Sequence, residues 1–196
     1  MNGMLAILRR VPRWVLFALA AVIQTALVAV LVFDRVGILR EGKEVMLRTR
    51  AVDPRDLLRG DYVTLNYEIS SVRSSDLKSQ PAPGRNTLLY LKLAPDAEGF
   101  YQPVSLHLEP MPVNDREVLV RGRVIHGGRC GNSVCPNIGL TYGIEKNSVP
   151  QGEGLEIEKA RNQGKVAVVA AVTPSGRAAI KRLLIDGKPV YDEPLF

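Results

Sequence analysis

Residue types that commonly carry catalysis or bind metals are scarce in this sequence. It has two histidines and two cysteines, and its first serine is Ser70. A membrane-anchored serine hydrolase needs its nucleophile close to the anchor, so the lack of serine in residues 1–69 disfavours that class. A Ser-His-Asp arrangement would depend on His107 or His126, and both lie among ordinary strand-forming residues. We therefore assign no catalytic residue from the sequence.

A clustered basic surface is also missing. Residues 1–36 carry four arginines and one aspartate, so +3 of the formal net charge of +6 lies in that short segment. A nucleic-acid-binding protein typically has a basic face interleaved with aromatic residues, and only 6% of the residues in the whole chain are aromatic. The sequence indicates no nucleic-acid partner, and we predict neither a cofactor nor a bound metal.

One long segment contains no charged residue. From Trp14 to Phe33 the sequence reads WVLFALAAVIQTALVAVLVF, in which only Gln24 and Thr25 are polar. As a helix this run would extend about 30 Å, the thickness of the hydrocarbon core of a bilayer. A cleaved signal peptide usually has a shorter apolar core, and a soluble core helix usually has a polar face. We therefore predict a single transmembrane anchor at residues 14–36, with the lipid bilayer as its surroundings.

Charge next to the anchor predicts its orientation. Arg9, Arg10 and Arg13 make the N-terminal flank purely basic, whereas the other side carries charges of both signs. Basic flanks stay on the cytoplasmic side of a membrane. We expect a cytoplasmic flank at residues 1–13, a linker at 37–44 and an exported domain at 45–196, which would be periplasmic or extracellular.

The exported part has the pattern of a β domain. In VTLNYEI, apolar and polar residues alternate, so Val63, Leu65, Tyr67 and Ile69 share one face of a strand, whereas KVAVVAAVT predicts a strand covered on both faces. EGLEIEKARNQ predicts one short helix that ends at Gly164, although its apolar residues would also suit a strand. We predict a mainly β fold, an antiparallel sandwich or barrel-like domain with one helix. The expected strands are 45–52, 61–69, 86–94, 100–109, 117–125, 138–145, 165–173 and 177–185.

A dense run of charges, DPRDLLRGDY, precedes the alternating strand. Asp53, Pro54, Gly60 and Asp61 together suit a turn that leads into a strand. That structural interpretation leaves three charges unexplained, namely Arg55, Asp56 and Arg59. Their position beside Tyr62 and Tyr67 also suits a binding or interaction surface.

The octet GDYVTLNY, residues 60–67, matches every fixed position of the GDYxxLxY signature. The sequence resembles the GDYxxLxY family of membrane-anchored bacterial proteins. The resemblance covers the octet, the preceding PRDLLR, the YGIEKNSVPQGEG block and the DGKPVYDEP tail. The resemblance implies a single-pass protein of the bacterial inner membrane with an exported domain, and it implies no particular activity. The residues that carry the signature are Gly60, Asp61, Tyr62, Leu65 and Tyr67.

A second block contains Tyr142 and four glutamates, of which Glu145 is the first. Charge runs of this kind usually form solvated surfaces, but a carboxylate here could instead pair with Arg55 or Arg59. Our candidate binding residues therefore come from both blocks: Arg55, Asp56, Arg59, Asp61, Tyr62, Tyr67, Tyr142 and Glu145.

The two cysteines lie in the loop-like segment GGRCGNSVCPN. Outside the cytoplasm such a pair usually oxidises, so we predict a disulfide between Cys130 and Cys135. Free thiols and a metal or redox role are the alternatives, although four residues separate the cysteines rather than the two of a common redox motif.

Three classes of function are compatible with these features. We favour a membrane-anchored domain that binds or scaffolds an envelope or membrane protein. The alternatives are an enzyme that uses the Arg/Asp/Tyr corner with the glutamate block, and a protein that binds a small ligand whose identity the sequence does not indicate. A flat apolar patch would favour a protein partner. A pocket would favour the alternatives if it were lined by Arg55, Arg59, Tyr62, Tyr67 and Glu145.

Overall fold

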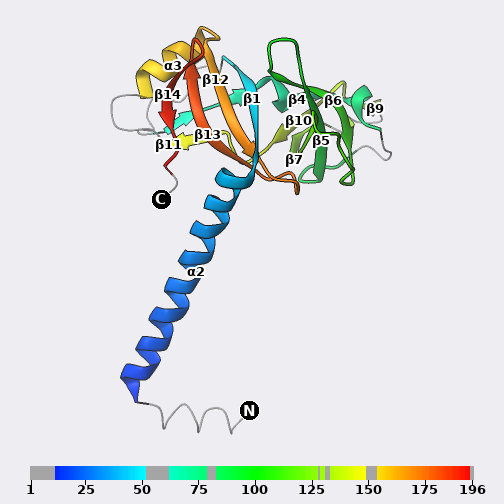
Figure 1. Ribbon diagram of the computed structural model, residues 1–196. Coiled ribbons are helices and arrows are strands. Elements are labelled where there is room, and N and C mark those ends of the chain that lie inside the picture. Colours follow the sequence, from blue (N-terminus) through cyan, green and yellow to red (C-terminus); the bar gives the residue numbers. More distant parts are fainter. Residues whose placement is uncertain are drawn as a thin grey trace. The chain divides into compact units, whose positions relative to one another are not determined.

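The computed structural model describes residues 12–51, 62–78, 83–127, 129–130, 133–148 and 154–194 (Figure 1). The chain divides between Gly37 and Ile38 into an N-terminal helical unit and a C-terminal β unit. Each unit is described by itself below.

The N-terminal unit consists of the apolar part of helix α2 (Arg13–Glu41). Its most apolar window has a mean hydropathy of 2.7, and none of that window is buried within the protein. A soluble core helix would bury such side chains against the rest of the fold. The long apolar helix predicted from the sequence is therefore present, and it is long and apolar enough to cross a membrane.

The residues that we expected to form a linker, 37–44, lie almost entirely within regular elements. Helix α2 continues to Glu41, and strand β1 (Lys43–Arg50) begins after Gly42. The reason is packing, because Ile38 and Leu39 are buried in a small apolar cluster with Ala171 and Ala179. Gly42 is required at this turn, since a Cβ atom there would lie 2.5 Å from the Ile38 carbonyl oxygen.

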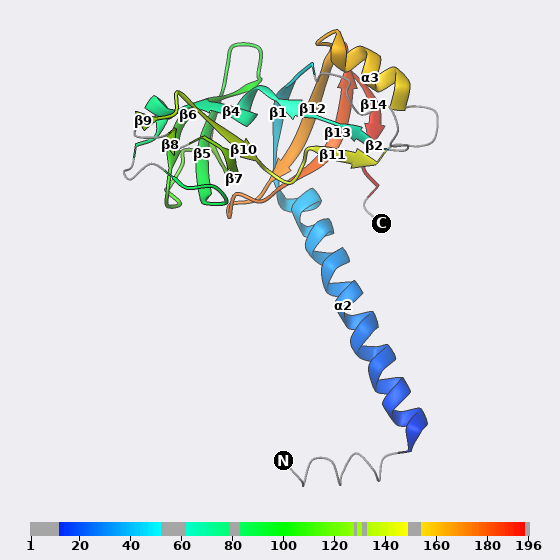
Figure 2. The same ribbon diagram turned by 180° about the vertical axis from the view of Figure 1, so that it is seen from behind.

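Two five-stranded antiparallel sheets form the β unit (Figures 1 and 2). The first has the order β14 (Lys188–Asp192), β13 (Ala178–Ile185), β12 (Val166–Val172), β1 and β3 (Asn66–Tyr67). The second has the order β4 (Ser71–Arg73), β10 (Asn137–Thr141), β7 (Val118–His126), β5 (Leu88–Pro95) and β6 (Tyr101–His107). The β unit also contains two short two-stranded ladders. In one, β2 (Tyr62–Thr64) pairs with β11 (Lys146–Ser148), and in the other, β8 (Arg129–Cys130) pairs with β9 (Ser133–Val134).

The sheets enclose one apolar core, to which both contribute the inward side of alternating strands. Strand β12 is buried at every position, as predicted, and on its second face Ala171 packs with Ile38 and Leu39. The sheets are also joined at their margins. Met46 on β1 forms a parallel bridge with Phe100, and the Arg121 N–H donates to the Gly176 carbonyl at 2.9 Å. These junctions give the predicted mainly β fold its barrel-like closure.

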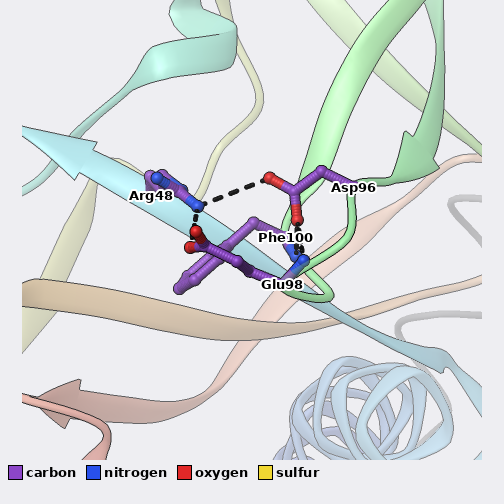
Figure 3. A network of polar contacts seen from close by, with 4 residues as sticks. All are labelled: Arg48, Asp96, Glu98 and Phe100. Atoms are coloured by element: carbon purple, nitrogen blue, oxygen red, sulfur yellow. Dashed lines mark hydrogen bonds and ion pairs between the residues drawn. The ribbon is translucent and has the colours of Figure 1, made fainter.

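Arg48 on β1 strengthens the first of these junctions (Figure 3). Its guanidinium lies 4.2 Å from the centroid of the Phe100 ring and pairs with Glu98 at 2.6 Å and Asp96 at 3.4 Å. Asp96 also accepts the backbone N–H groups of Glu98 and Phe100, both at 2.9 Å. Cation–π and ionic contacts therefore tie β1 to the hairpin between β5 and β6, although the Arg48 Nε atom is buried without a partner.

The predicted short helix is α3 (Gly154–Asn162), and Gly164 follows it with a φ of +71°. Ile157 and Ala160 are buried in the core, so the helical interpretation of this segment is confirmed over the strand. Arg161 is only 3% exposed, and its guanidinium donates to the Thr64 carbonyl. The helix is thereby attached to β2, in the segment that carries the GDYVTLNY octet.

Candidate functional site

The described part of the octet, Tyr62 to Tyr67, has a buried side and an open side. Leu65, Tyr67 and the following Ile69 are each at most 2% exposed, which confirms the predicted inward face for these three residues. Thr64 and Asn66 are exposed on the other side. The strand is not continuous, because β2 pairs with β11 and β3 pairs with β1, and a 3-10 turn (Glu68–Ser70) follows.

Tyr67 and Tyr142 connect two distant segments by reciprocal hydrogen bonds. The Tyr67 hydroxyl donates to the Ile144 carbonyl at 2.5 Å, and the Tyr142 hydroxyl donates to the Ile69 carbonyl at 2.5 Å. Burial, together with the nearby Glu145 charge, raises the pKa of both phenols well above 10. The two hydroxyls are therefore permanent donors at neutral pH. We call this pair of bonds the tyrosine clasp.

Glu145 organises the turn on which the clasp depends. Its carboxylate accepts the backbone N–H of Tyr142 at 2.5 Å and that of Gly143 at 2.9 Å, where Gly143 has a φ of +81°. Its own carbonyl accepts the Leu65 N–H at 2.7 Å. The side chain thus closes the turn, and the main chain of the same residue attaches that turn to the octet.

A cavity of about 360 Å³ opens over this region. Buried parts of Leu65, Tyr67 and Leu140 form its apolar lining, and the polar lining comes from several strands. We define the motif groove by these polar residues: Arg50, Thr64, Asn66, Ser70, His126, Thr141 and Glu145.

Backbone register brings the polar residues of the motif groove together. Arg50 is the cross-strand partner of Asn66 in the pairing of β1 with β3. His126 is the partner of Gly139 in the pairing of β7 with β10, and its ring lies directly over that glycine. A Cβ atom on Gly139 would overlap the His126 ring, so glycine provides the room that the imidazole occupies.

The motif groove offers donors and acceptors suited to binding a polar chain or an anionic group. The Arg50 guanidinium and the Asn66 amide are donors on exposed side chains, and hydroxyl groups and the Glu145 carboxylate add acceptors. Within the described ranges, no group of three or more histidine, cysteine, aspartate or glutamate residues could hold a metal ion.

The predicted site residues are only partly placed. Tyr67, Tyr142 and Glu145 lie together as a structural unit, in which Tyr67 and Glu145 also line the cavity. Tyr62 belongs to β2, but its side chain lies outside what the structure describes, as do Arg55, Asp56, Arg59, Gly60 and Asp61 in full. The predicted pairing of Arg55 or Arg59 with Glu145 therefore stays a prediction. Sequence reasoning missed six of the residues that define the groove: Arg50, Thr64, Asn66, Ser70, His126 and Thr141.

Ser105 and His107 form a serine–histidine pair that does not line the groove. The Ser105 hydroxyl and the His107 Nε2 atom are 2.8 Å apart on β6. Burial lowers the pKa of His107, and the charges of Lys92 and Lys78 lower it further. Ser105 is only 6% exposed, so its hydroxyl is placed to satisfy the histidine within the sheet rather than to reach a substrate.

Cys130 and Cys135 form the predicted pair. Their Sγ atoms are 1.96 Å apart and their Cα atoms 5.1 Å apart, which is disulfide geometry. Cys130 lies in the β8–β9 hairpin, and the Cys135 carbonyl accepts the Ser74 hydroxyl. The bond therefore links the hairpin to the chain that leads into β10.

In a comparison with protein-family models, residues 24–183 match the family described as GDYXXLXY protein. No curated protein and no solved structure matches the chain. The matched range includes the groove, the tyrosine clasp and most of the apolar helix.

Proposed function

The chain belongs to the GDYXXLXY family, and from its geometry we propose that it is a single-pass membrane protein whose exported β domain binds an envelope or membrane protein in the motif groove. In this proposal α2 spans the bacterial inner membrane with residues 1–13 in the cytoplasm. Residues 45–196 would lie in the periplasm or outside the cell.

Three features support this location. The apolar helix has the length of a membrane span, and the basic residues Arg9, Arg10 and Arg13 precede or begin it. The disulfide pair is a third, independent feature, because disulfides persist in oxidising compartments and are rare in the cytoplasm.

One observation supports a binding role above all. The described octet turns its Leu65 and Tyr67 side chains into the core, while Thr64 and Asn66 stay exposed and line the groove. Polar side chains beside an apolar floor are the usual components of a protein-binding surface. Exposed Arg50 at one side of the groove favours an acidic or hydrogen-bonding segment of the partner.

The binding proposal can be tested by photo-crosslinking of the full chain in living cells. A photoreactive amino acid at Asn66 or Thr141 should give an adduct of defined mass, whereas the same amino acid at exposed Lys188 on β14 should not. Arg50→Glu should lower the yield from Asn66 several-fold, because it reverses the charge beside that position. Equal adducts from Asn66 and Lys188 would refute a specific groove.

Orientation needs its own test. A reporter enzyme fused after Phe196 should be active only if it is of a type that works outside the cytoplasm. Activity of a reporter that works only in the cytoplasm would contradict the exported position of the domain.

Small-ligand binding is the second candidate, and the cavity itself favours it. Its volume of about 360 Å³ is within the range of small-molecule sites, and Arg50 and Glu145 supply charges of both signs. A ligand of this kind should raise the melting temperature of the wild-type protein but not that of Arg50→Ala. If no compound in a library of anionic and zwitterionic metabolites raises the melting temperature in this way, the result would argue against small-ligand binding.

A further inference from the structure

Gln24 is placed at the middle of the apolar helix. The uncharged run extends from Trp14 to Phe33, so about 15 Å of helix lies on either side of this residue. If α2 spans a membrane as proposed above, the carboxamide of Gln24 lies near the bilayer centre, where no water can hydrogen-bond to it. The side chain is exposed on the helix surface, and no described residue hydrogen-bonds to it.

Thr25, the neighbouring polar residue, does not pose the same problem. A threonine hydroxyl can bond to the carbonyl four residues earlier in its own helix, which for Thr25 is that of Ala21. The Gln24 amide, by contrast, carries both donors and an acceptor, and no described residue bonds to it. Its two N–H groups and its carbonyl therefore need a partner from another molecule.

The helix surface around Gln24 permits a close neighbour. Ala20 and Ala21 precede it by four and three residues, and Leu27 and Val28 follow it by three and four, so all share its face. Ala20 and Ala21 are small, so a second helix backbone can approach this part of the face within a membrane, and polar side chains then bond across such an interface.

We propose that α2 pairs in parallel with α2 of a second copy of this chain through reciprocal hydrogen bonds between the two Gln24 side chains. A second copy in the same orientation necessarily brings an amide to the same depth, and an amide is both donor and acceptor. An unrelated helix would need a polar residue at that depth by coincidence. This inference rests on the membrane-spanning role of α2 proposed above.

Cysteine crosslinking of the full chain in membranes can test the pairing. The chain has two cysteines, which are bonded to each other, so one added cysteine is the reactive thiol. Val28→Cys lies about 40° from Gln24 around the helix, whereas Ala29→Cys lies about 140° away at nearly the same depth. After oxidation, Val28→Cys should form the covalent dimer several-fold more than Ala29→Cys.

Removing the amide completes the experiment. In the Val28→Cys background, Gln24→Leu should lower dimerisation roughly three- to thirtyfold. Thr25→Val should leave it unchanged. Equal crosslinking of the two cysteine variants, no effect of Gln24→Leu, or an adduct only with another protein would overturn pairing with a second copy.

Alkaline extraction of the same membranes separates the two proposals. A chain that stays in the membrane pellet but does not dimerise would overturn the pairing and leave the anchor intact. A chain released into the supernatant would overturn the anchor, and the pairing with it.

Discussion

The tyrosine clasp makes a quantitative prediction for stability. Tyr67 is fully buried, and Tyr67→Phe removes its hydroxyl but keeps the ring. The Ile144 carbonyl therefore loses the donor that it has in the wild type. A buried polar group that loses its partner costs about 1–3 kcal/mol. Tyr142→Phe should cost a similar amount, since its hydroxyl bonds to the Ile69 carbonyl in the same arrangement. Both values are losses in the free energy of unfolding.

The measurement is urea unfolding of a soluble fragment that starts at Gly37 and so retains Ile38 and Leu39. Tyr90→Phe on β5 is the matched control, because it removes the same atom from a half-buried residue and should change stability by less than about 0.5 kcal/mol. The double variant of the clasp should lose less than the sum of the single losses, because both bonds join the same two segments. Single variants that unfold like the control would refute the clasp.

The clasp also predicts how stability depends on alkaline pH. Burial raises the pKa of Tyr67 and Tyr142 above 10, whereas both would titrate near 10 in the unfolded chain. The unfolded state therefore loses protons first, and folding stability should fall as pH rises above about 10. Tyr67 and Tyr142 should ionise only on unfolding, which ultraviolet absorbance can follow.

Three further predictions concern other parts of the β unit. A hydrogen bond from Lys181 lowers the pKa of Glu44, and one from Lys92 lowers the pKa of Glu117. The free energy of unfolding should therefore be retained above about pH 4.5 and decline below it, which urea unfolding curves at a series of pH values would measure. Arg48→Ala should lower the free energy of unfolding by about 1 kcal/mol, and Arg48→Lys should restore only part of it because lysine lacks the planar guanidinium; calorimetry of the three proteins would show this. Mass spectrometry under thiol-blocking conditions should find Cys130 and Cys135 linked, and reduction should cost about 2 kcal/mol; two blocked thiols would contradict the bond.

Hydrophobic pattern and turn chemistry were sufficient to predict most of the fold. The runs VTLNYEI and KVAVVAAVT predicted which side chains are buried. The structure confirms the prediction for Leu65, Tyr67 and Ile69 and for every residue of β12. Strands of two or three residues, such as β4, β8 and β11, were not predicted, because their pairing depends on neighbours that the local sequence does not reveal. Strand β14 was missed because all its side chains are at least partly exposed, so no apolar alternation marks it.

The octet shows why alternation alone was insufficient to predict strand continuity. The same buried face extends from Leu65 to Ile69, yet the backbone changes its hydrogen-bond partner from β11 to β1 and then forms a 3-10 turn. The change occurs at Leu65, whose N–H bonds to the Glu145 carbonyl. Partner choice depends on residues about 80 positions away, and it is not a local property.

The groove was harder to predict than the residues beside it. Tyr142 and Glu145 were singled out because they form a distinctive block, and they are indeed close to Tyr67. Arg50, Asn66, His126 and Thr141 come from four strands, and each is ordinary in its own segment. Only the register of β1 with β3 and of β7 with β10 places them around one cavity.

The signature itself separates the roles of structure and binding. Among its described positions, the fixed residues Leu65 and Tyr67 are the buried ones, and Tyr67 also forms half of the clasp. Two positions that the pattern leaves free, Thr64 and Asn66, are exposed and line the groove. A pattern that specifies the core while leaving the groove unspecified can preserve one fold and still allow different partners. For this reason the signature identifies the architecture of the domain, and if the groove binds a partner as proposed, the free positions are where its specificity should be sought.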